Sequence, residues 1–127
     1  MSSNRKNYPT ESELEVLQVL WLKGASSVRS VNEVLNERRD VGYTTTLKIM
    51  QIMTEKGLVT RDTNSRTHIY SAAVEENHTQ KSLLENFIDK TYRGSAMRMV
   101  MQALGNQDAS PDELESLKKI IKDLENK

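Results

Sequence analysis

The sequence predicts a mainly α-helical protein with one small β-hairpin, and three observations support this fold class. Apolar residues recur at helical spacing along most of the chain, and Gly or a Ser/Thr cap marks where these stretches end or begin. Two short segments, VTRD at 59–62 and THIY at 67–70, flank a polar tip as hairpin strands do. No strand pattern follows residue 73. We therefore expect two parts, residues 1–73 with the hairpin and residues 74–127 with helices alone.

Composition restricts the class of protein. The chain has no cysteine, which excludes disulfides and thiolate metal sites. No apolar run approaches the ~20 residues that a membrane helix needs, and the first ten residues lack the apolar segment of a secretory signal. We therefore expect a soluble, cytoplasmic protein without membrane insertion.

The first two helices are predicted from their ends. Thr10-Glu11-Ser12-Glu13 has the pattern of a capping box, and the helix that it begins stops at Lys23-Gly24. Ser26 or Ser27 can cap a second helix, which we expect to end at Arg38-Arg39. Positive charges at that end suit the helix dipole, so they need no nucleic acid to explain them.

The third helix is expected from Tyr43 to Lys56, with Gly57 as its left-handed C-cap. One face carries residues at the spacing of a buried stripe: Thr46, Ile49, Met50 and Met53. The opposite face carries polar side chains that can reach base edges and phosphates: Thr44, Thr45, Lys48, Gln51 and Glu55.

A helix with this polar face beside a hairpin tip that bears Arg66 is the layout of a winged helix-turn-helix domain that reads DNA. Lys48 could donate to guanine or to a phosphate, and the hydroxyls and methyl groups of Thr44 and Thr45 suit bases. Arg66 suits the minor groove or a phosphate, and Arg29, near the start of the second helix, is a candidate positioning contact. The alternative for Lys48 is an ordinary solubilising surface lysine.

The distribution of charge agrees with this assignment, although the formal net charge of the chain is zero. Residues 1–73 hold 10 Lys and Arg against 8 Asp and Glu, a net charge of +2. Residues 74–127 hold 8 against 10, a net charge of −2. The positive part is thus the one with the hairpin and the exposed helix.

The last part of the chain predicts three helices. They run from about Glu75 to Tyr92, from a cap at Ser95 to Leu104, and onward from Ser110-Pro111. About fifty residues are too few to bury a stable core alone, so their apolar faces need a partner. The partner could be the first part of the same chain or a second copy, and we expect a homodimer.

No catalytic site is visible in the sequence. His68 and His78 lack the companions of a metal site, no Gly-rich phosphate loop occurs, and no Ser or Thr has a plausible base beside it. The expectation is a protein that is not an enzyme and has neither cofactor nor metal.

The sequence resembles the penicillinase-repressor family of bacterial transcription regulators, the BlaI/MecI/CopY type. The resemblance rests on ESELEVLQVLW at 11–21, YTTTLKIMQIMTEKGLV at 43–59, THIYS at 67–71 and YRGS at 92–95. It implies a dimeric winged-helix repressor that binds a palindromic operator and dimerises through its C-terminal helices. Matching positions imply that Thr44, Thr45 and Lys48 read the major groove, and that Arg66 serves the wing.

The resemblance also implies a regulatory partner, a membrane-bound sensor protease. Antibiotic-responsive members are cut at an Asn-Phe bond, and the matching position here holds Gln102-Ala103, which departs from that pattern. We therefore expect a sequence-specific DNA-binding transcriptional repressor that acts as a homodimer. The alternative is a winged-helix protein-interaction module without DNA binding.

Overall fold

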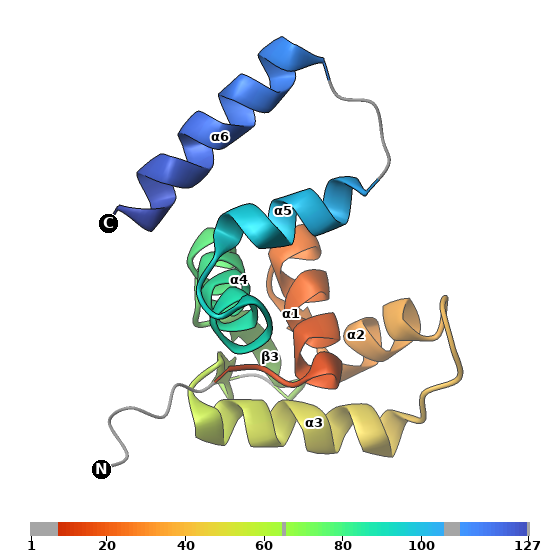
Figure 1. Ribbon diagram of the computed structural model, residues 1–127. Coiled ribbons are helices and arrows are strands. Elements are labelled where there is room, and N and C mark those ends of the chain that lie inside the picture. The colour runs from red at the N-terminus through yellow and green to blue at the C-terminus, as the bar shows by residue number, and fades with distance from the viewer. Residues whose placement is uncertain (1–7, 65, 106–109, 127) are drawn as a thin grey trace. The chain divides into compact units, whose positions relative to one another are not determined.

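The computed structural model describes residues 8–64, 66–105 and 110–126. Their helices and strands follow in the order α1 (Glu11–Lys23), β1 (Ser26–Ser27), α2 (Val28–Leu35), α3 (Tyr43–Lys56), β2 (Val59–Asp62), β3 (Ile69–Ala72), α4 (Glu76–Tyr92), α5 (Ala96–Leu104) and α6 (Pro111–Glu125) (Figure 1). The predicted mainly α fold with a small β element is confirmed. The chain forms two compact units, of which the first ends at Thr79 and the second begins at Gln80, inside α4.

The first unit is built on α1, α2 and α3, which pack around one apolar core closed by the sheet. Burial of this apolar surface is the main stabilising contribution to such a small unit. Trp21 packs against the core, and its Nε1 donates to the Val74 carbonyl oxygen at 3.0 Å. The fully buried side chains come from all three helices and both hairpin strands: Val16, Leu17, Val31, Thr46, Met50, Met53, Val59 and Tyr70.

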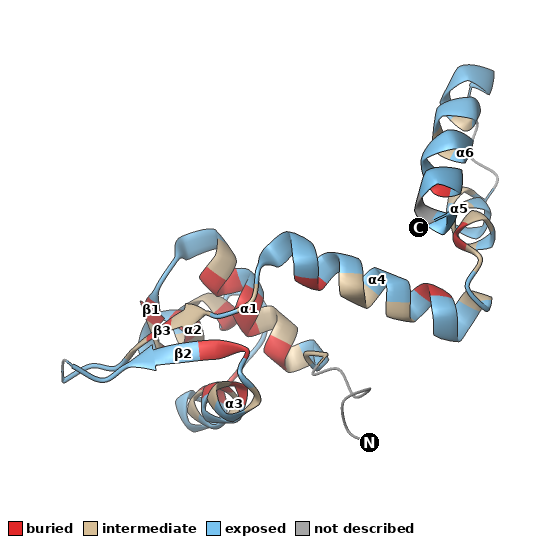
Figure 2. Ribbon diagram, turned by 90° about the vertical axis from the view of Figure 1, so that its left-hand side faces the viewer, coloured by how far each residue is buried: buried red, intermediate tan, exposed pale blue. Residues whose placement is uncertain are grey.

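The sheet has the order β1-β3-β2 and is antiparallel throughout. Ser26 pairs with Tyr70 and Ser27 with Ile69, so the residue that precedes α2 is held directly beside the hairpin. We call the hairpin Val59–Ala72 the wing. Figure 2 shows the loop of the wing extending beyond its strands as an exposed segment.

The structure differs from the sequence prediction in one additional strand and in two element boundaries. The strand β1 was not expected, because two serines carry no alternating pattern. The strand β3 begins at Ile69, two residues later than predicted, since the last cross-strand pair is Asp62 with Ile69 and Thr67 and His68 belong to the loop. The expected end of α2 at Arg38-Arg39 was wrong, because the helix stops at Leu35.

The predicted helix caps of α1 and α3 are confirmed. The Thr10 N–H donates to Glu13 Oε1 at 2.9 Å, and the Glu13 N–H donates to Thr10 Oγ1 at 3.2 Å, which completes the capping box. Gly57 ends α3 with a φ of 82°, the left-handed region that favours glycine.

In the second unit, the buried residues Ile88, Ala96 and Ile121 form a small core, with four half-buried apolar residues packed against it. Glu125 Oε2 accepts from the Ala96 N–H at 2.9 Å, which joins α6 to the start of α5. Several large apolar side chains of this unit lie exposed when the chain is taken alone: Leu84, Phe87, Met101 and Ile120.

Within the described ranges, no helix is long and apolar enough to cross a membrane. In the same part of the chain, no group of three or more His, Cys, Asp or Glu side chains is placed to hold a metal ion.

An ion pair joins the start of α1 to the end of α3. Lys56 Nζ lies 2.7 Å from Glu13 Oε1, and the Glu13 side chain is only 6% exposed. Burial alone would raise the pKa of Glu13, but hydrogen bonds with Lys56 and Thr10, together with the charge of Lys56, lower this pKa below its ordinary value of 4.5. The charged carboxylate therefore stabilises the fold above pH 4.5, and its contribution is lost as the pH falls through the lowered pKa.

We expect Glu13→Gln to lower the free energy of unfolding at neutral pH by roughly 1–3 kcal/mol, because the charged hydrogen bonds are lost. The difference from wild type should narrow below pH 4.5 and close below the lowered pKa of Glu13. Urea unfolding followed by the fluorescence of Trp21, the one tryptophan of the chain, measures both effects in the first unit.

The matched control is Glu11→Gln, which removes an exposed carboxylate from the same helical turn. It should cost about 0.5 kcal/mol. A Glu13→Gln variant whose deficit is absent, or stays constant from neutral pH to about pH 3, would contradict the assignment.

Candidate nucleic-acid interface

The helix α3 separates into a buried and an exposed face, as predicted. Thr46, Met50 and Met53 have no exposed surface and lie in the core. The side chains of α3 proposed to reach base edges and phosphates all lie exposed: Thr44, Thr45, Lys48 and Gln51. The geometry of the face is therefore confirmed, whereas its contacts with bases remain predictions.

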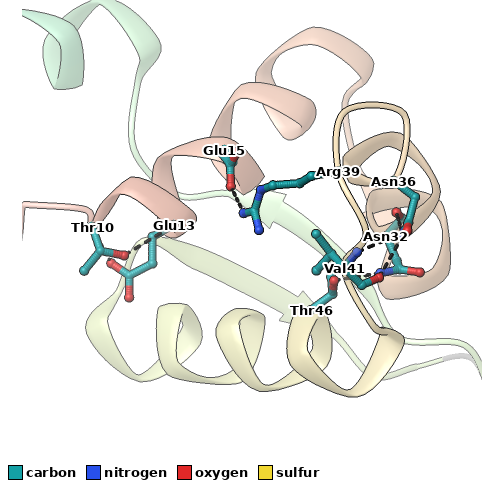
Figure 3. A network of polar contacts seen from close by, with 8 residues as sticks. All are labelled: Thr10, Glu13, Glu15, Asn32, Asn36, Arg39, Val41 and Thr46. Carbon is teal, nitrogen blue, oxygen red and sulfur yellow. Dashed lines mark hydrogen bonds and ion pairs between the residues drawn. The ribbon is translucent and has the colours of Figure 1, made fainter.

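Hydrogen bonds from α2 fix the start of α3 (Figure 3). Asn32 Nδ2 donates to the Val41 carbonyl oxygen at 2.9 Å and to Thr46 Oγ1 at 2.8 Å. Asn36 Nδ2 donates to the same carbonyl oxygen at 2.8 Å, and Asn36 Oδ1 accepts from the Val41 N–H at 3.2 Å. We call these contacts the asparagine network. It satisfies the polar groups of a turn that would otherwise be buried unpaired, and so sets the angle between the two helices.

This network also explains why α2 ends early. The Asn36 side chain bonds to the turn, and the N–H groups of Arg38 and Arg39 both donate to the Leu35 carbonyl oxygen. The chain then turns toward α3, and Arg39 pairs with Glu15 of α1 instead of extending the helix (Figure 3). Because both side chains of that pair are partly exposed, we expect it to add little stability.

Arg29 and Arg66, which are 37 positions apart in the sequence, line one hollow of about 260 Å³. We call it the wing hollow. The starts of α2 and α3 and the end of the wing loop form its walls, and its lining is Ser27, Val28, Arg29, Tyr43, Leu47, Arg66, Thr67, His68 and Tyr70.

The wing hollow adds Tyr43 and His68 to the candidate interface. The sequence pattern predicted His68 in a strand. The structure has it exposed in the wing loop, where it lines this hollow. The pairing of β1 with β3 brings it there, and a two-residue strand gives no signal from which that placement could have been predicted.

A larger hollow of about 680 Å³ lies between α1 and α2, and we call it the helical hollow. Its lining includes Leu14, Val34 and Leu22, the last of which is 84% exposed in the isolated chain. None of the residues predicted to contact DNA lines it.

Comparison with known proteins shows which protein family the sequence matches. A sequence profile described as penicillinase repressor matches residues 9–123 of the chain. The methicillin resistance regulatory protein MecI of Mammaliicoccus sciuri is 29% identical over 119 residues, which cover 93% of this chain and 97% of that protein. The transcriptional regulator BlaI of Mycobacterium tuberculosis is 27% identical over 118 residues, with 89% and 82% covered.

A solved structure shares the fold. The crystal structure of the transcriptional regulator Tm0710 from Thermotoga maritima matches with a TM-score of 0.51 over 93% of this chain and 80% of that one. Its sequence is 19% identical, so the likeness concerns the fold alone. The three helices and wing of the first unit are accordingly a winged helix-turn-helix arrangement.

We expect Thr46→Val to lower the free energy of unfolding by roughly 1–3 kcal/mol, because the partly buried Asn32 amide loses the acceptor of one hydrogen bond. Asn32→Ala should destabilise as well. The two substitutions together should cost less than the sum of the single costs, since both remove the same contact. Urea unfolding followed by Trp21 fluorescence measures this coupling.

The comparison variant is Thr46→Ser, which keeps the hydroxyl and loses one methyl group, at a cost of about 0.8 kcal/mol. Strictly additive costs for Asn32→Ala and Thr46→Val would show that their hydrogen bond does not stabilise the fold.

Proposed function

The chain belongs to the penicillinase repressor family, and from that premise we propose that it is a transcriptional repressor that binds a palindromic operator as a homodimer. The names of its relatives, a methicillin resistance regulatory protein and a transcriptional regulator, support a role in regulation. The proposal assigns residues 1–73 to DNA binding and residues 74–127 to dimerisation. It also places the protein in the cytoplasm, where the operator is.

One observation supports DNA binding most strongly. The helix α3 buries Thr46, Met50 and Met53 in the core. It leaves Thr44, Thr45, Lys48 and Gln51 exposed on its other face, beside the arginines of the wing hollow. A helix of 14 residues fits the major groove, where hydroxyl, amide and ammonium groups can read base edges. Arg66 and Arg29 would then contact phosphates, which fix the position of the helix without reading sequence.

The proposed mechanism is occupancy without chemistry. A dimer would place its two α3 helices in major grooves on the same side of the DNA. The centres of the two half-sites would then lie one helical turn, about 34–36 Å, or a multiple of that distance apart. A bound dimer on a promoter would keep polymerase from it. Neither a cofactor nor an enzymatic step enters this mechanism.

Dimerisation is proposed for the second unit. Its core is small, and Leu84, Phe87, Met101 and Ile120 leave apolar surface exposed in the single chain. Covering such surface with a second copy would stabilise both partners by the hydrophobic effect.

Release of repression by a membrane-bound sensor protease remains part of the proposal. Gln102 and Ala103 lie exposed near the end of α5. A protease needs an extended segment, so cleavage there requires that the last turn of α5 unwinds first.

A protein-interaction module without DNA binding is the competing function, and the helical hollow with its exposed Leu22 favours it. A gel shift on the DNA upstream of the protein's own gene, repeated over a range of salt concentrations, separates the two. Contact with phosphates releases counterions, so affinity must fall steeply with salt. Absence of binding at low salt would reject the proposed function.

We expect Lys48→Ala to weaken binding to the operator by roughly 1–3 kcal/mol, with a smaller effect on unrelated DNA, if Lys48 contacts a base. If it contacts a phosphate, both kinds of DNA should be bound more weakly to the same extent, and the slope of log affinity against log salt should flatten by about one unit per half-site. Lys23→Ala, which removes an exposed charge from the end of α1, is the matched control and should bind as wild type does. Unchanged binding of the Lys48 variant to both duplexes would remove Lys48 from the interface.

A fragment that ends at Thr79 should fold, because it retains the whole core of the first unit, Val74 included. It should be monomeric and bind the full operator ~10²–10⁴-fold more weakly than the intact chain, since the second half-site is no longer engaged intramolecularly. Sedimentation and titrations on full and half operators measure both. A dimeric fragment, or one that binds the full site as tightly as the intact chain, would refute this division of labour.

A further inference from the structure

We propose that the wing hollow binds a single phosphate of the DNA backbone, which Arg29 from α2 and Arg66 from the wing contact together. The proposal rests on the DNA-binding function proposed above and specifies one contact within it. Two arginines that each touch a separate phosphate would be the simpler expectation from the sequence, so the shared phosphate is a distinct claim.

The backbone brings the two arginines to one place. Ser27 both pairs with Ile69 of β3 and caps α2, its Oγ accepting from the Ser30 N–H at 3.1 Å. Arg29 therefore follows the sheet by two residues, while Arg66 precedes β3 by three. The sheet fixes both chain segments, and both arginines line the wing hollow.

The lining of the wing hollow suits an anion. Arg29, Arg66 and His68 supply N–H donors, Tyr43 and Thr67 supply hydroxyls, and none of the described lining residues is a carboxylate. The positive end of the α2 dipole lies at the same wall, because Val28 and Arg29 are its first residues. Among partners of a DNA-binding domain, the phosphate diester is the anion that this set fits.

One phosphate is enough for both arginines. A guanidinium group is planar and can donate two parallel hydrogen bonds to two oxygens of one phosphate. Two guanidinium groups can therefore bind the same phosphate from different sides. The hollow of about 260 Å³ has room for such a group together with a few waters of ~30 Å³ each. Because Tyr43 and Leu47 of α3 form another wall, the bound phosphate would also set the depth and register of α3 in the groove.

The variants Arg29→Ala, Arg66→Ala and the double variant test the shared phosphate in the intact protein on its own promoter DNA. Each single change should weaken binding about tenfold. The double variant should lose little more than either single one. The slope of log affinity against log salt should flatten by about 0.9 for each half-site, the value for one phosphate, and so by about 1.8 for a dimer on the full operator. Arg38→Ala removes an exposed arginine from the far end of the α2 region, outside the wing hollow, and should change neither quantity.

A second arm changes only the DNA. Neutral methylphosphonates replace the operator phosphates one position at a time in each half-site. At one position the wild-type affinity should fall about tenfold, and on that duplex both single variants should bind as tightly as wild type. Compared with the alanine variants, Arg29→Lys and Arg66→Lys should restore the salt dependence of wild type but only part of its affinity. A lysine ammonium group keeps the charge but cannot form the bidentate hydrogen bonds of a guanidinium group.

Three results would overturn the proposal in favour of separate phosphates. They are losses that multiply in the double variant, a slope reduced by about 1.8 for each half-site, and different methylphosphonate positions for the two arginines. Variants that bind as wild type does would overturn it as well. If the unmodified protein shows no salt-dependent binding, the proposed DNA-binding function fails before any variant is made, so the two failures are distinguishable.

Discussion

The position of α3 depends on the asparagine network between α2 and α3. Val41 and Thr46 are buried, so the polar groups around them need partners inside the protein, and Asn32 and Asn36 supply them. These bonds end α2 and set the turn, and the turn determines which face of α3 enters the core. The same orientation of α3 leaves the face with Lys48 exposed. At the other end of α3, the ion pair between Lys56 and Glu13 holds the helix against α1.

The net charge of the chain does not favour DNA binding, but the local arrangement of its basic side chains does. A chain without net charge has no long-range attraction for DNA, and residues 1–73 carry a surplus of only two positive charges. The arginines of the wing hollow and the lysine of α3 are nevertheless brought onto neighbouring elements of one unit. Binding with so few cations would depend on geometry and on a second half-site, which is why dimerisation through the second unit is central to the proposal.

Most of the fold could be predicted from the sequence, because local signals mark its elements. The capping box at Thr10, the glycine at 57 and the buried stripe of α3 each depend on residues close in the chain. Three features could not be predicted from the sequence: the strand β1, the early end of α2 and the wing hollow. Each depends on contacts outside the local helical pattern, such as those of Ser27 with Ile69 or Asn36 with Val41. The exposed face of α3 was predicted as a group from the sequence, and the structure adds that Arg29 and Arg66 line one hollow.

Amide chemical-shift mapping of the intact, nitrogen-15-labelled protein can show whether α2, α3 and the wing contact DNA. The titrant is the duplex from upstream of the protein's own gene, at two salt concentrations. We expect the largest changes on the start of α2, on α3 from Tyr43 to Gln51, and on the wing from Arg66 to His68. Changes concentrated on the helical hollow around Leu14, Leu22 and Val34, with α3 unaffected, would contradict this expectation.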